Sequence, residues 1–208
     1  MTARTLPLFG APAAAAAALL TLATAVPAAA TSVVPVTLRC TASALGVTQT
    51  TTQTDDWTVS APASVASGGW FDVTITPPSW VAPTMLGSAT ATSIKNVTLR
   101  ITITNATLKG VGPLSGGSGN LGTTAVSISG GTIVVTASGP IPAGASWQLP
   151  SITLSLTAGT AGMPATTSLT GTALTYTTVV RSGPFTINAP TSCTPVPDPT
   201  ILTSTDVT

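Results

Sequence analysis

The chain has 208 residues, of which six are Lys or Arg and five are Asp, with no Glu and no His. Charged residues usually make up about a quarter of a globular domain, and this chain lacks the clustered Lys and Arg that nucleic-acid binding requires. The absence of histidine excludes zinc sites built on His and catalysis by Ser-His-Asp or Cys-His sets. The 43 Thr and 20 Ser residues are expected to take the solvent-facing role that Lys and Glu play elsewhere.

The first 30 residues have the organisation of a secretory signal peptide. Arg4 supplies the positive start, residues 11–22 form an apolar Ala-rich stretch, and residues 26–30 end it with a proline and small residues. The closing alanines fit the A-x-A rule, so cleavage is predicted after Ala30. An uncleaved membrane anchor is the alternative, but the apolar stretch is shorter than the roughly 20 residues that a span needs. The sequence therefore predicts a secreted or cell-envelope protein whose mature chain has no transmembrane helix.

Apolar and polar residues alternate with a period of two through most of the remaining chain, flanked by Gly, Pro and Ser, which is typical of β-strands. The clearest strand covers residues 96–104, where every second side chain is large and apolar. Further strands are predicted over residues 34–42, 48–59, 70–76, 124–129, 132–137, 151–158, 169–180 and 184–187.

A hairpin is predicted around Gly130-Gly131, because a two-residue glycine loop tolerates the positive φ of tight hairpin turns. This register pairs Ile128 with Ile133 and Val126 with Val135. All four side chains then lie on one face, so the turn and the apolar pattern agree.

These strands predict an all-β fold, an antiparallel immunoglobulin-like β-sandwich of about eight or nine strands in one domain over residues 31–189. The glycine-rich residues 112–122 are expected to form a mobile loop; no Gly-Lys-Ser/Thr sequence ends them, so they are not a phosphate-binding loop. Residues 190–208, rich in Pro and Thr, are predicted to form an extended C-terminal tail.

Two cysteines, Cys40 and Cys193, lie near the two ends of the predicted mature chain. An even number of cysteines in an exported protein indicates a disulfide. No histidine is present to activate a thiolate, so the structural role is favoured over a redox or catalytic one.

The groups available for acid–base chemistry are the five Asp residues and Tyr176. Asp55 and Asp56 are adjacent on a predicted strand and would point to opposite faces, although Asp72 could approach one of them. A Ca²⁺ site needs six to eight oxygen ligands, so solvated carboxylates are the favoured interpretation. The sequence predicts no metal, no cofactor and no enzymatic activity.

Trp80 is the candidate residue for contact with a ligand or a lipid interface. It lies between Pro78 and Pro83, in a predicted loop where an indole could be exposed. The alternative is that the tryptophans close the two ends of the sandwich.

Four segments carry a resemblance to a known family; they read VTLRC, SIKNVTLRITI, NLGTTAVSISGGTIVVTASGPIPAGASWQLP and PTSCTPVPDPTILTSTDV. They resemble a family of secreted two-cysteine β-sandwich proteins of actinobacteria such as mycobacteria and Rhodococcus. Its function is uncharacterised, although its members often carry the automatic labels "cyclase" or "dehydratase". The resemblance implies export to an actinobacterial cell envelope and implies no catalytic residue.

The main functional hypothesis is a secreted or envelope-associated, non-catalytic protein with a structural or binding role. Envelope lipid, polymer or protein are the partners it indicates. A second hypothesis is an envelope-inserted β pore or channel assembly, since low charge and alternating strands suit a lipid-facing band around a hydroxyl-lined lumen. A third is a hydrolase or cyclase that uses Asp72 or the Asp55–Asp56 pair.

Overall fold

The computed structural model describes residues 28–44 and 46–208, and within them every regular element is a β-strand. The strands are β1 (Ala29–Ala44), β2 (Val47–Pro62), β3 (Ser64–Val65), β4 (Trp70–Thr76), β5 (Trp80–Val81), β6 (Met85–Leu86), β7 (Ala89–Thr104), β8 (Ala106–Val111), β9 (Thr124–Ser129), β10 (Thr132–Ala137), β11 (Ile141–Pro142), β12 (Ser146–Trp147), β13 (Ile152–Ala158), β14 (Ala165–Leu169), β15 (Leu174–Ser182), β16 (Phe185–Pro195) and β17 (Thr200–Val207).

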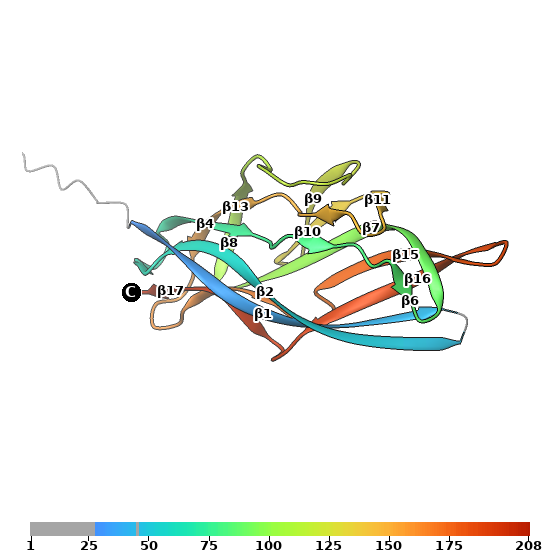
Figure 1. Cartoon of the computed structure of the whole chain (residues 1–208). Coiled ribbons are helices and arrows are strands. Elements are labelled where there is room, and N and C mark those ends of the chain that lie inside the picture. The colour runs from blue at the N-terminus through green and yellow to red at the C-terminus, as the bar shows by residue number, and fades with distance from the viewer. Residues whose placement is uncertain (1–27, 45) are drawn as a thin grey trace, which may run out of the picture.

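Most strands belong to one long sheet that folds over itself. Its order runs β3-β17-β14-β7-β15-β16-β1-β2-β4-β13-β8, with β9 and β10 attached through β7, and all but the short β3–β17 pairing are antiparallel. β4, β8 and β13 lie over the half that holds the C-terminus, whereas the hairpins β1–β2 and β15–β16 extend toward the opposite end (Figure 1). The prediction of an antiparallel all-β fold is confirmed, and the arrangement is consistent with a β-sandwich. Immunoglobulin-like connectivity stays a prediction.

The predicted hairpin at Gly130-Gly131 is confirmed. β9 and β10 pair with Ile128 opposite Ile133 and Val126 opposite Val135. Both β10 residues are fully buried, but Ile128 is 56% exposed because β9 pairs only with β10.

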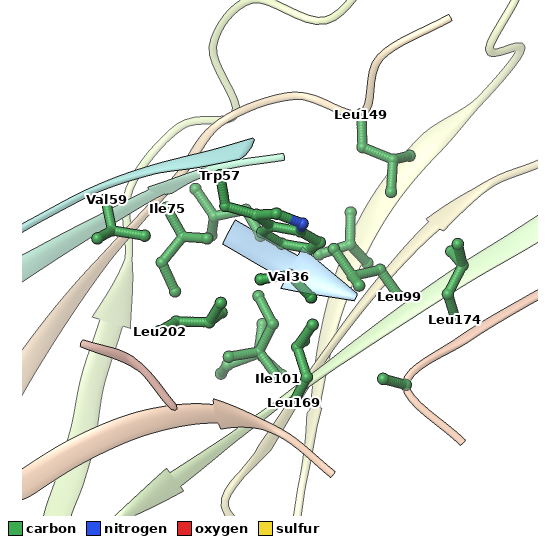
Figure 2. Packing of buried hydrophobic residues seen from close by; sticks show 14 of the residues in the cluster. Val36, Trp57, Val59, Ile75, Leu99, Ile101, Leu149, Leu169, Leu174 and Leu202 are labelled. Atoms are coloured by element: carbon green, nitrogen blue, oxygen red, sulfur yellow. The ribbon is translucent and has the colours of Figure 1, made fainter. Parts of the chain in front are cut away.

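The core lies between the folded-over halves of the sheet. Trp57 of β2 is fully buried and lies at the centre of the cluster, with Ile75, Leu99 and Ile101 around it (Figure 2). Each of these residues is flanked in sequence by polar or exposed positions. The alternation that predicted the strands therefore also selects the face that packs inward.

The low charge of the chain is matched by hydroxyl pairs across neighbouring strands. Thr37 lies 2.7 Å from Thr54 between β1 and β2, measured between their Oγ1 atoms, and two further pairs follow along the same hairpin. Thr74 and Thr153 form a similar pair between β4 and β13. Such cross-strand pairs stabilise a sheet. Hydroxyl side chains therefore provide the side-chain contacts between neighbouring strands that Lys and Glu would provide elsewhere.

More strands are present than the eight or nine predicted, for three reasons. Five of the elements are only two residues long, too short to produce a visible alternation. The predicted strand 169–180 is divided between β14 and β15, and β8 and β17 were not predicted at all. The predicted strand 96–104 is the second half of the longer β7, which carries a positive φ of 53° at Asn96.

Residues 190–208 were expected to form a tail, but they contribute strands to the sheet. β16 continues to Pro195, and β17 pairs with β14 and β3. Leu202 and Val207 are buried in the core. The prolines suggested an extended chain, and the short alternation after Pro199 was too weak to reveal that it is paired.

The glycine-rich residues 112–122 were expected to be mobile, but they are packed against the body. The Ser115 and Ser118 N–H groups donate to the carbonyls of Ser151 and Gln148 at 3.3 and 3.0 Å. Leu121 is 9% exposed and belongs to the core. Glycine is required here because the chain runs directly against other backbone, as at Gly119 (φ 83°), where a Cβ would lie 2.8 Å from the Ser146 carbonyl oxygen.

The predicted signal peptide lies almost entirely outside the described residues. The cleavage site predicted after Ala30 falls at the start of β1, where Ala29 and Ala30 pair with Pro62 and Ala61 of β2. Cleavage stays a prediction. Within residues 28–44 and 46–208, the structure contains no helix of the length and apolarity needed to cross a membrane.

Candidate functional site

Three of the four tryptophans form one cluster. Trp80 packs edge-on against Trp57 with ring centroids 6.0 Å apart, and packs against Trp147 at 4.8 Å with the rings tilted by 38°. The two-residue ladder between β5 and β12 fixes the second contact, because it places Trp80 directly opposite Trp147. Trp80 is only 7% exposed, so it lies in a short strand rather than in the open loop expected from its flanking prolines.

Asp55 holds Trp80 in place. The Trp80 Nε1–H donates to Asp55 Oδ2 at 2.9 Å, and the Gln53 amide donates to both oxygens of the same carboxylate at 2.8 and 2.9 Å. Hydrogen bonds to a charged acceptor are stronger than neutral ones. Asp55 therefore fixes β5 to β2 across a gap that no backbone ladder spans.

Two other indole N–H groups in the cluster are buried without an acceptor. The Nε1 atoms of Trp57 and Trp147 have no hydrogen-bond partner among the described residues. Buried donors without acceptors are uncommon in folded proteins. Both rings are almost fully buried, at 0% and 2% exposed, so these two donors belong to the interior of the cluster.

Residues 80–87, which include β5 and β6, form what we call the strap. The strap crosses the inner face of the β1–β2 hairpin with few backbone bonds to it. Besides the Trp80–Asp55 bond, the Gly87 N–H donates to Gln49 Oε1 at 2.8 Å. Ala82 exchanges two backbone bonds with the β11–β12 turn, at 3.0 Å to the Ala145 carbonyl and 2.9 Å from the Gly144 N–H.

Three hollows follow one another beneath and beside the strap, and together we call them the strap groove. The inner hollow, about 50 Å³, is lined by Leu38, Cys40, Gln53, Asp55, Trp80, Val81, Pro83, Ile94, Trp147, Leu174 and Tyr176. The middle hollow, about 70 Å³, is lined by Cys40, Ala42, Gln49, Thr51, Pro83, Met85, Leu86, Tyr176, Thr178 and Thr191. The outer hollow, about 330 Å³, is lined by Ala44, Val47, Gln49, Leu86, Gly87, Ser88, Ala89, Thr90, Arg181, Ser182 and Gly183.

The hollows are consecutive because neighbouring ones share lining residues. The inner and middle hollows share Cys40, Pro83 and Tyr176, and the middle and outer hollows share Gln49 and Leu86. Along β1 the lining advances from Leu38 to Ala44, which corresponds to about 20 Å of strand at ~3.3 Å per residue. The groove is therefore elongated and runs parallel to the strands.

Polarity changes along the groove. In the inner hollow the carboxylate of Asp55 is already engaged by Trp80 and Gln53, and none of the residues lining the middle hollow carries a formal charge. Arg181 is the one charged residue among those that line the outer hollow. Burial raises the pKa of the Tyr176 phenol, so this group stays neutral in the groove at physiological pH.

The predicted disulfide between Cys40 and Cys193 is confirmed. The two residues are directly opposite in the β1–β16 ladder. Cys40 lines the inner and middle hollows, so the bridge joins the two strands beneath the groove. A disulfide of this kind is typical of proteins exported to an oxidising compartment.

The structure separates the aspartates that the sequence analysis considered together. Asp55 is half-buried toward the strap while Asp56 is exposed, as expected for neighbours on a strand. Asp72 lies on the outer face of β4, where it accepts a hydrogen bond from the Ser155 hydroxyl at 2.7 Å. In the part of the chain that the structure describes, no three Asp, Glu, His or Cys side chains are close enough to hold a metal ion.

The sequence pointed to Trp80 but did not reveal the groove. Its walls come from residues 38–55, 80–94 and 174–191 and from Trp147, and only the strand order brings them together. One sequence signal was present: the inner face of β2 reads Val47, Gln49, Thr51, Gln53 and Asp55, which is too polar for a packed core and predicts a face that is only partly covered.

Comparisons with known proteins found a similar fold but no family. No protein-family model matches the chain, and no curated protein matches it. Among solved structures, it is similar to a protein from Corynebacterium diphtheriae described as "Putative membrane anchored protein", with a TM-score of 0.55 and 23% sequence identity. The alignment covers 85% of this chain and 38% of that protein, so the chain spans well under half the length of its structural neighbour.

Proposed function

We propose that the protein is a non-catalytic binding protein of the cell envelope, and that the strap groove binds a single-chain amphiphile. The apolar chain lies along the inner and middle hollows, and an anionic head lies at Arg181. The observation that carries this proposal is the row of three hollows that share lining residues. The carboxylate of the inner hollow is engaged by Trp80 and Gln53, the middle hollow has no formal charge, and the outer hollow carries Arg181. The outer hollow alone has the size of a small-molecule site.

The narrow inner part requires the strap to move outward when a chain enters. The strap stays tied to β12 and β7 by the β5–β12 and β6–β7 ladders, so the movement is a displacement away from β2. Its hydrogen bonds to β2 are the Trp80–Asp55 bond and the Gly87–Gln49 bond. The Gly87–Gln49 bond contributes about 1 kcal/mol net and the bond to the Asp55 carboxylate about 1.5–3 kcal/mol. The burial of about five methylene groups at ~0.8 kcal/mol each offsets that sum. The ligand's own apolar surface therefore supplies the free energy for opening.

Location in the envelope rests on three observations. The first 30 residues have signal-peptide organisation, the chain carries a disulfide, and a protein of similar fold is described as membrane anchored. A non-catalytic role is supported by Asp55, whose two oxygens are engaged by Gln53 and Trp80, and by Tyr176, whose pKa is raised by burial.

The test uses quenching of tryptophan fluorescence by a doxyl-labelled stearic acid and by its uncharged methyl ester. The variant Trp70→Phe serves as the background, because Trp70 is 75% exposed and lines none of the three hollows. A doxyl group quenches only indoles that it approaches closely. We expect both compounds to quench Trp80 and Trp147 at concentrations below those at which they form micelles.

Two neighbouring residues of β2 supply a matched pair of variants. Thr51 lines the middle hollow, while Thr52 points to the outer face of the same strand, and both are exposed. Thr51→Phe should abolish quenching and Thr52→Phe should leave it unchanged. Arg181→Gln should weaken binding of the doxyl-labelled acid about tenfold, because a charge-assisted contact contributes ~1.5 kcal/mol or more. Binding of the uncharged ester should not change. Equal quenching in both Thr variants, or none in the background protein, overturns the proposal.

A further inference from the structure

Three hairpin tips gather at the end of the molecule farthest from the C-terminus. They are the β1–β2, β6–β7 and β15–β16 turns, and all three contribute to the outer hollow (Figure 1). The Gly87–Gln49 hydrogen bond joins two of them, and β15 pairs with β7 up to the Arg181–Thr90 position. The tips therefore form one surface rather than three separate loops.

Each tip carries a large apolar side chain that faces solvent. Val47 on the first hairpin is 60% exposed, Met85 on the second is 48% exposed, and Phe185 on the third is 69% exposed. Small polar residues lie between them, including Ser88 and Ser182. Single apolar residues scattered over a surface need no explanation. Here, however, each of three adjoining tips exposes one, which indicates a shared contact surface.

The charge at this end is positive. Arg181 lies among the tips, whereas the acidic residue of β2 closest to them in sequence, Asp55, is eight residues from Val47. At about 3.3 Å per residue that separation is on the order of 26 Å along the strand, well beyond the ~8 Å screening length at physiological ionic strength. An anionic partner therefore meets a basic side chain at the tips without a nearby carboxylate on this strand.

We propose that this end docks on an anionic lipid surface, with Val47, Met85 and Phe185 inserted into the interface and Arg181 at the headgroups. A rigid protein partner would have to match three apolar points separated by a polar hollow, whereas a fluid lipid interface receives each side chain independently. Apolar insertion combined with attraction to anionic lipid is the usual basis of such binding. The docking needs no ligand in the strap groove, so it stands independently of the proposed function.

The experiment is flotation of the purified protein with vesicles of phosphatidylcholine alone and vesicles containing phosphatidylglycerol. We expect preferential binding to the anionic vesicles. Phe185→Ser should weaken that binding about tenfold, since burial of most of a Phe side chain is lost, and Val47→Ser should weaken it by a smaller factor. Arg181→Gln should remove the preference for anionic vesicles. Trp70→Ser is the matched control, an exposed aromatic on β4 at the opposite end, and should bind like the unmodified protein.

Three outcomes overturn the proposal. The unmodified protein could fail to bind either vesicle, or Phe185→Ser and Trp70→Ser could bind equally well. The protein could instead form a dimer in sedimentation that Phe185→Ser dissociates, in which case the tips contact a second copy of the chain. Circular dichroism of each variant checks folding; the substituted side chains are exposed, so the spectra should not change.

Discussion

The bond between Asp55 and Trp80 should be a measurable source of stability. Asp55→Ala removes the acceptor of the 2.9 Å bond and leaves the indole N–H of a residue that is only 7% exposed without a partner. An unsatisfied buried donor costs about 1–3 kcal/mol. Because Asp55 is half-buried rather than buried, solvent screening places the effect near the lower end, at about 1.5 kcal/mol.

A double-mutant cycle isolates the bond from the loss of packing. Trp80→Phe removes the N–H but keeps a ring against Trp57 and Trp147. If the bond has the value inferred, the two substitutions together should cost about 1 kcal/mol less than the sum of their separate effects. Asp55→Asn, which keeps an oxygen acceptor, should cost about 0.5 kcal/mol.

The assay is urea unfolding followed by circular dichroism, since the cycle itself alters tryptophan fluorescence. For a domain of this size, 1.5 kcal/mol corresponds to a decrease of about 3–6 °C in the thermal midpoint. A coupling free energy below about 0.3 kcal/mol, within the usual additivity error, would refute the reasoning. Asp55 and Trp80 would then be neighbours that do not hold the strap.

Three further predictions concern stability. Replacing both Cys40 and Cys193 by Ala should lower the free energy of unfolding by about 5 kcal/mol in the chain-entropy model, because the bridge spans 153 residues; a loss below about 1 kcal/mol in urea unfolding contradicts this value. Tyr176 is the single tyrosine, and burial raises its pKa above the unfolded value. The contribution of this pKa difference to the free energy of unfolding is complete below the unfolded pKa of about 10, and it is lost as pH rises through the higher folded pKa. Absorbance of the phenolate should show a midpoint above ~10, and Tyr176→Phe should remove the alkaline loss of stability; a midpoint at the ordinary value disproves the raised pKa. Gly119→Ala should cost at least 2 kcal/mol more than Gly116→Ala, because both have positive φ but only Gly119 would place a Cβ within 3 Å of backbone, while Gly116 has nothing within 4 Å; equal midpoints in thermal unfolding would show that residues 112–122 do not pack as described.

Local sequence signals predicted the parts of the fold that depend on neighbours along the chain. The register of β9 and β10 follows from Gly130-Gly131 and the positions of four apolar residues. The disulfide follows from the number of cysteines and the signal-peptide organisation. Neither requires knowledge of which distant strands pair.

The groove depends on pairings that the sequence does not encode locally. Trp80 looked like a loop residue because β5 is two residues long and lies between prolines, yet its partner Trp147 is 67 positions away. Leu202 gave no sign of its burial because two prolines precede β17. The strap, β2 and β15 meet only after the long sheet folds over itself, so the polar inner face of β2 does not indicate what lies opposite it.

The central claim is that an apolar chain lies beneath the strap, and photo-crosslinking tests it most directly. A stearic acid that carries a diazirine on its chain is irradiated with the full mature protein, and the adducts are located by mass spectrometry. The account predicts adducts on the strap and on residues that line the inner and middle hollows, such as Met85 and Tyr176, with loss of these adducts in Thr51→Phe but not in Thr52→Phe. Adducts on the outer threonine face of β2, or an unchanged pattern in Thr51→Phe, would contradict it.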